Sequence, residues 1–162
     1  MLPSRAHKSN QGFTLLETAT IVVVIGILAA ISAPSLLGWY NRTKVDSALN
    51  EVRKALQQAQ REAMRKGKVC QVELIEATAS EQAKVNNCIF SRTLSKGVQI
   101  DPSNGSTISF GFRGNTNNNN TIRVYFSDNP VPEQKCLAVS MPLGIMRTGT
   151  YKANGDPKCQ KQ

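Results

Sequence analysis

The sequence predicts an α+β protein in which one long N-terminal helix, about residues 13–66, packs on a small antiparallel β-sheet domain. Residues 18–40 contain no charged side chain. Beyond them, apolar residues recur at alternating spacings of four and three, which is the period of one helix face. After Gly67 the pattern changes to short β-rich runs separated by turn residues. A helix followed by a series of strands is typical of the α+β class.

A short polar leader, residues 1–12, precedes the helix. It carries Arg5, Lys8 and His7, the only histidine of the chain. A secretory signal would place an apolar core of ~7–15 residues directly after the basic region and end at a small-residue cleavage site. Here Glu17 interrupts that order, and the apolar stretch continues past the weak site at Ala33. Cleavage as an ordinary secretory signal is therefore the less favoured alternative.

Residues 13–40 are predicted to form a membrane helix. Trp39 and Tyr40 fit the aromatic belt at a membrane surface, and basic residues follow at once. Glu17 is costly in such a segment, so a carboxylate there indicates a partner and a function. Pro34 lacks an N–H donor, so a kink or a locally extended segment is expected between residues 26 and 38.

Residues 41–67 are predicted to continue as an amphipathic helix. We expect its apolar stripe to pack on the globular domain, with a coiled coil to a partner helix as the alternative. Gly67 follows two basic residues and is a typical helix stop. The stripe consists of Val45, Leu49, Val52, Leu56, Ala59 and Ala63.

The β-rich domain is predicted to span residues 68–162. Residues 115–120 form a polar low-complexity loop, and residues 76–84 are compatible with helix or loop. The expected strands are residues 69–74, 88–92, 98–101, 107–112, 121–126, 137–141 and 145–151.

Four cysteines indicate two disulfides and an oxidising compartment. They are Cys70, Cys88, Cys136 and Cys159. Of the three connectivities, Cys70–Cys88 with Cys136–Cys159 closes the shortest loops and is the expected one. The alternative is four free thiols in a reducing compartment. The predicted disulfides place the C-terminal domain outside the membrane.

Neither an enzyme nor a metal site is expected. The only histidine lies in the leader, no cysteines have metal-site spacing, and no nucleotide-binding loop or carboxylate pair is evident. No cofactor is predicted. Residues 42–68 carry eight basic and three acidic side chains. This basic segment predicts either a solvated helix face or attraction to acidic groups.

The junction between leader and helix resembles the processing motif of type IV pilins and pseudopilins. It is the run Gly12-Phe13-Thr14-Leu15-Leu16-Glu17, followed by the apolar segment with Pro34. The resemblance implies that a prepilin peptidase cuts between Gly12 and Phe13 and that the new Phe13 amine is methylated. It also implies that Glu17 pairs with the terminal amine of a neighbouring pilin subunit, and that the helix between Glu17 and Pro34 loosens in a filament.

The C-terminal strands resemble those of the GspH/FimT group of minor pilins and pseudopilins. The similar residues are those from Cys136 to Ser140 and the run Gly144-Ile145-Met146-Arg147. Some members of that group bind DNA through a Gly-Arg-x-Arg motif at this place, whose first arginine is Ile145 here. Arg147, Lys152, Lys158 and Lys161 are the remaining candidate DNA contacts.

Together these resemblances predict a minor, low-abundance type IV pilus subunit that is assembled into a filament or primes it. The alternatives are a pseudopilin of type II secretion and a DNA-binding minor pilin of natural transformation. Expected partners are other pilin subunits, the prepilin peptidase and the inner membrane before assembly, with DNA as a further candidate. The expected location is a single-pass inner-membrane protein with a periplasmic C-terminal domain, and the pilus after assembly.

Overall fold

The computed structural model describes residues 12–78, 81–127, 134–154 and 159–160, without the side chains of residues 32–35 and 37. The chain forms two compact units, residues 1–37 and 38–162. The helix α1, Leu15–Lys66, runs through the boundary between them. The expected α+β architecture is confirmed, because in the described residues one long helix is followed by antiparallel strands.

Helix α1 has clear signals at both ends. The Thr14 hydroxyl oxygen accepts a hydrogen bond from the backbone N–H of Glu17 (3.3 Å), which satisfies one of the free donors of the first turn. Arg65 and Lys66 lie in the last turn, and Gly67 stops the helix at a φ of 63°. Residues 26–38 are helical throughout, so the extended segment expected there is not present in this structure.

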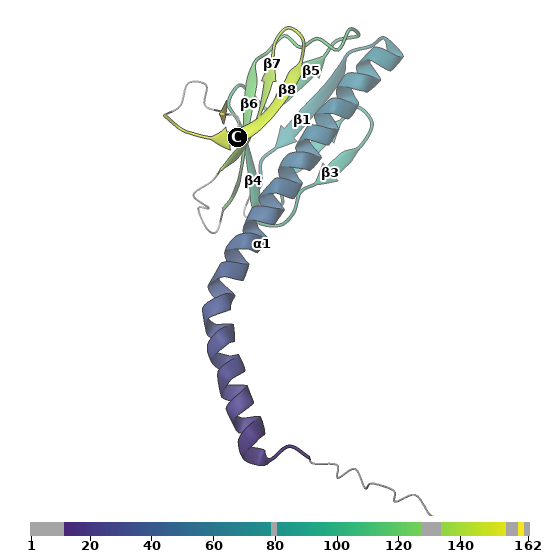
Figure 1. Ribbon diagram of the computed structural model, residues 1–162. Coiled ribbons are helices and arrows are strands. Elements are labelled where there is room, and N and C mark those ends of the chain that lie inside the picture. Colours follow the sequence, from purple (N-terminus) through teal and green to yellow (C-terminus); the bar gives the residue numbers. More distant parts are fainter. Residues whose placement is uncertain (1–11, 79–80, 128–133, 155–158, 161–162) are drawn as a thin grey trace, which may run out of the picture. The chain divides into compact units, whose positions relative to one another are not determined.

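In the described part of the chain, nine strands follow the helix and form two antiparallel sheets rather than the single sheet expected. The first has the order β3-β2-β1-β5 and the second β4-β6-β7-β8-β9 (Figure 1). Their bounds are β1 Cys70–Ile75, β2 Lys84–Asn87, β3 Ser91–Thr93, β4 Val98–Pro102, β5 Thr107–Phe110, β6 Asn120–Phe126, β7 Lys135–Ser140, β8 Ile145–Tyr151 and β9 Cys159–Gln160. Strands β2 and β9 were not expected, and the strand expected over residues 88–92 is the shorter β3.

The core of the second unit lies between the C-terminal half of α1 and the inner faces of both sheets. Every residue of the predicted apolar stripe of α1 is at most 6% exposed. These side chains form one cluster with buried residues of the first sheet, such as Val72 and Phe110, and of the second, such as Ile122 and Leu137. The stripe therefore packs within its own chain, and the coiled-coil alternative is not needed to bury it.

Candidate assembly and interaction sites

The residues of the predicted processing motif lie together at the start of α1. Phe13 is 75% exposed, and a Cβ added at Gly12 would meet nothing within 4 Å, so the peptide bond between them is open to an enzyme. Thr14 and Glu17 occupy the positions of a capping box, in which the residue three places after the cap is Glu or Gln. This Thr-x-x-Glu spacing is a sequence signal for a helix start, and the structure records the hydrogen bond from the Glu17 N–H to the Thr14 hydroxyl.

The first part of α1 exposes a continuous apolar surface. Leu15, Leu16, Val22 and Ile31 are each between 68% and 87% exposed, and all described side chains of residues 12–31 are exposed. Within the described part of the chain, no helical segment meets both the length and the apolarity needed to cross a membrane. The side chain of Pro34 lies outside the described residues. An apolar surface of this kind marks a site of interaction with protein or lipid.

The two disulfides join neighbouring elements of the β-rich domain. Cys70 at the start of β1 is bonded to Cys88, which follows β2, and Cys136 of β7 is bonded to Cys159 of β9. Of the three possible connectivities, this is the one that was expected because it closes the shortest loops. The second bond fastens the two-residue strand β9 to its sheet.

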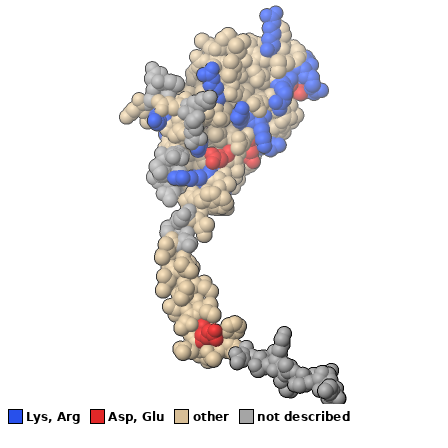
Figure 2. Space-filling model, in the orientation of Figure 1, with Lys and Arg blue, Asp and Glu red and all other residues tan. Residues whose placement is uncertain are grey.

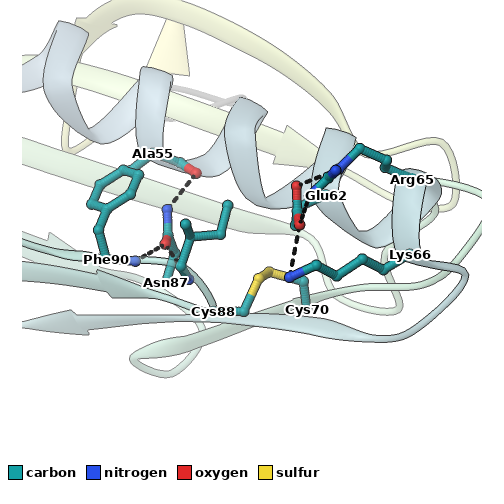
Figure 3. The surroundings of a disulfide bond; sticks show 9 residues. Ala55, Glu62, Arg65, Lys66, Cys70, Asn87, Cys88 and Phe90 are labelled. Carbon is teal, nitrogen blue, oxygen red and sulfur yellow. Dashed lines mark hydrogen bonds and ion pairs between the residues drawn. A yellow bond between two sulfur atoms is a disulfide. The ribbon is translucent and has the colours of Figure 1, made fainter.

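Asn87 connects the first disulfide's loop to the helix (Figure 3). Its side-chain oxygen accepts hydrogen bonds from the N–H groups of Ile89 and Phe90 at 2.9 and 2.8 Å. Its side-chain amide donates to the carbonyl oxygen of Ala55 on α1 at 3.4 Å. One asparagine thus shapes the turn around Cys88 and fixes that turn against the helix.

An ion cluster closes the last turn of α1 beside this loop (Figure 3). The Glu62 carboxylate accepts hydrogen bonds from the Arg65 guanidinium at 2.6 and 3.0 Å and lies 2.8 Å from the Lys66 ammonium. The hydrogen bond from Arg65, followed by that from Lys66, lowers the pKa of Glu62 from its ordinary value of 4.5 to about 2. The same bond raises the pKa of Arg65. The cluster neutralises part of the basic end of the helix.

We expect the Glu62 cluster to stabilise the fold in a pH-dependent way. Because the pKa of Glu62 is lower in the folded chain, its contribution is complete above pH 4.5 and is lost as the pH falls through about 2. Glu62→Gln should therefore lower Tm by about 1–3 °C at pH 7 and have no effect below pH 2. The matched control is Glu81→Gln, whose pair with Lys84 is longer (3.5 Å) and more exposed. Thermal unfolding at several pH values checks this, and a pH-independent difference would contradict it.

The candidate DNA contacts are only partly brought together. Arg147 is exposed on β8 and lines a groove together with Arg53 of α1, whereas Lys152 does not line that groove. Lys152 is exposed after the end of β8, while Lys158 and Lys161 lie outside the described residues.

Gly144, before β8, has a φ of 66°, and a Cβ there would come within 2.8 Å of the Gln60 amide. Figure 2 shows Lys and Arg side chains gathered over the β-rich unit and its helix.

No residue cluster suggests a metal-dependent reaction. Among the described residues, no three His, Cys, Asp or Glu side chains are grouped so that they could hold a metal ion.

Known proteins that are similar in sequence are pilins and a secretion protein. The chain is 44% identical over 61 residues to a fimbrial protein of Pseudomonas aeruginosa and 43% identical over 61 residues to the type IV major pilin protein PilA of Myxococcus xanthus. It is 45% identical over 42 residues to the type II secretion system core protein G of Escherichia coli. The match covers 38% of this chain and 39% of the fimbrial protein, 38% of this chain and 27% of PilA, and 26% of this chain and 28% of the secretion protein. The chain thus spans well under half of the length of these relatives. No family model matches the chain.

The fold is shared with a solved minor pilin. The type IV minor pilin FimU of Pseudomonas aeruginosa superposes with a TM-score of 0.52 at 12% identity, over 72% of this chain and 95% of FimU. At that identity the likeness concerns the fold. The sequence relatives are named as a fimbrial protein, a type IV major pilin and a type II secretion core protein, and the fold of this chain is that of a solved minor pilin. The chain is thus similar in sequence to type IV pilins over 61 residues and shares the α+β fold of a solved minor pilin.

Proposed function

We propose that this protein is a minor subunit of a type IV pilus, cut by a prepilin peptidase and assembled through its N-terminal helix. The observation that carries the proposal is the combination of a pilin-like processing junction with an uncovered apolar helix. The apolar side chains of residues 13–31 need a lipid or protein environment, and an α1 of 52 residues leaves its first half free of the core.

We propose that the same segment inserts into a membrane before assembly. Residues 18–40 carry no charge, and a helix of about 20 residues spans the apolar core of a bilayer. We propose one pass through the inner membrane with the disulfide-bonded unit in the periplasm. Packing against other pilin-like helices would replace lipid in the filament. A structural role of this kind requires no catalytic group.

A pseudopilin of type II secretion is the second candidate. The similarity to a type II secretion core protein, at 45% identity over 42 residues, favours it. The two roles predict different consequences of deleting the gene. Loss of pili with normal protein secretion supports the minor pilin, and normal pili with lost secretion supports the pseudopilin.

Mass spectrometry of the protein purified from its own membranes tests the processing step. The expected mass is that of residues 13–162 with one added methyl group and two disulfides, and the N-terminal peptide should begin with methylated Phe13. An N terminus after Ala33 would indicate removal by signal peptidase and would contradict assembly through this helix. An uncut chain beginning at Met1 would contradict processing altogether.

A further inference from the structure

A groove with a volume of about 770 Å³ lies where the second sheet meets α1, within the compact unit of residues 38–162. Its walls come from α1, β7, β8 and β9. Its lining includes Arg53, Ser140, Met146, Arg147, Thr148 and Gln160. We call it the Arg53/Arg147 groove.

The groove covers part of one sheet face, where Ala138 and Ser140 of β7 line it, and it extends over the edge of β8. Met146, Arg147 and Thr148 all line it, although consecutive residues of a strand point to opposite faces. Strand β8 pairs with β7 along residues 145–150. Strand β9 covers the other side of β8 only at Thr150 and Tyr151, so within the described chain residues 145–148 have a neighbouring strand on one side. A strand edge of this kind offers N–H and C=O groups to another chain.

Two arginines approach the groove without an acidic partner. The ion pairs among the described residues involve Glu62, Glu81 and Asp101, and none of them reaches Arg53 or Arg147. Arg53 comes from the helix and is partly buried, whereas Arg147 is exposed on β8. A guanidinium presents its donors in a planar fork that matches a carboxylate, so two of them on one groove favour an anionic group.

We propose that the Arg53/Arg147 groove receives an extended, acidic segment of a partner protein. The segment adds as a strand beside residues 145–148 of β8 and places a carboxylate against Arg53 and Arg147. A strand edge alternates donors and acceptors, which a second peptide backbone matches. A nucleic-acid backbone supplies acceptors only and would leave the edge carbonyls of β8 unpaired, so the geometry favours a peptide over DNA.

Fluorescence anisotropy with the full mature chain in detergent micelles tests this proposal. The probe is a labelled peptide of alternating valine and glutamate. We expect Arg53→Gln and Arg147→Gln each to weaken its binding about 10-fold, the effect of losing one charged hydrogen-bond partner. Arg61→Gln is the matched control, since Arg61 is exposed on α1 and does not line the groove. A glutamine version of the peptide should bind about 10-fold more weakly to the unmodified chain.

A glutamate peptide with methylated backbone nitrogens separates strand addition from simple charge attraction. It keeps every carboxylate and loses the N–H donors, so its binding should be lost. Equal binding of the methylated and unmethylated peptides would overturn the proposal, as would binding that the arginine substitutions leave unchanged.

Other occupants give different results in the same series. Binding of a short DNA duplex, with no binding of the peptide, would assign the groove to nucleic acid. Concentration-dependent self-association that Arg147→Gln abolishes, measured by sedimentation of the chain alone, would assign it to a second copy. Either result overturns the proposal, and neither bears on Phe13 processing, so the proposed function is tested separately.

Discussion

Replacing Phe110 by alanine is expected to lower the free energy of unfolding by about 3–5 kcal/mol. Phe110 is the largest fully buried side chain and is 0% exposed. It lies on β5 opposite Cys70 of β1, in the cluster that unites α1 with both sheets. Its ring also approaches the turn at Gly144, where an added Cβ would lie 3.3 Å from the ring. The substitution therefore opens a cavity at a place where three parts of the fold meet.

Phe112→Ala is the matched control for this substitution. It removes the same ring two residues further along, but Phe112 is 56% exposed and stacks only under the Arg113 guanidinium. We expect a change within about 0.5 kcal/mol. Urea unfolding of the full chain in mild detergent, followed by the circular dichroism of both variants, provides the measurement. Equal losses for the two variants would show that Phe110 does not anchor the core.

The helix could be predicted from the sequence because its signals are local. The spacing of apolar residues identified six buried positions of the helix but missed Ala48 and Ala55, which are also buried, and Gly67 marked the end within one residue. Strand β8 was also placed at its observed bounds, since turn residues bound the run of residues 145–151.

The unexpected strands depend on distant contacts. Strand β2 has the sequence Lys-Val-Asn-Asn, with a single apolar residue, and it is a strand because β1 and β3 pair with it on either side. Strand β9 consists of two residues held beside β8, one of which is bonded to Cys136. Local propensity contains no information about such partners.

The candidate sites divide in the same way. The residues from Gly12 to Glu17 are contiguous, so their grouping at one helix end could be seen in the sequence. The Arg53/Arg147 groove could not, because its two arginines are far apart in the sequence and line one groove only in the folded chain. The sequence placed Arg53 in a basic helix segment with either a solvated face or an attraction to acidic groups, and it made Arg147 a candidate DNA contact together with lysines.

Glu17→Gln is expected to reduce the number of assembled pili at least about 10-fold, while cleavage at Phe13 continues. In the proposed filament, the Glu17 carboxylate pairs with the terminal amine of a neighbour in an apolar setting. Glutamine keeps the size and the capping-box position of the side chain but removes its charge. An unpaired ammonium in that setting is strongly unfavourable. Electron microscopy of sheared pili, with mass spectrometry of the membrane-bound subunit, measures assembly and processing separately.

Thr14→Ala separates this assembly role from helix initiation. Thr14 accepts the hydrogen bond from the N–H of Glu17, so its loss weakens the first turn by about 1 kcal/mol and leaves the carboxylate in place. If Glu17 acts through an ion pair between subunits, Thr14→Ala should assemble nearly normally. If both substitutions prevented assembly to the same degree, the cap of α1 would be the requirement, and the charge of Glu17 would have no separate role. Normal pili from Glu17→Gln would exclude the ion pair, because no other acidic residue lies between the cleavage site and Asp46.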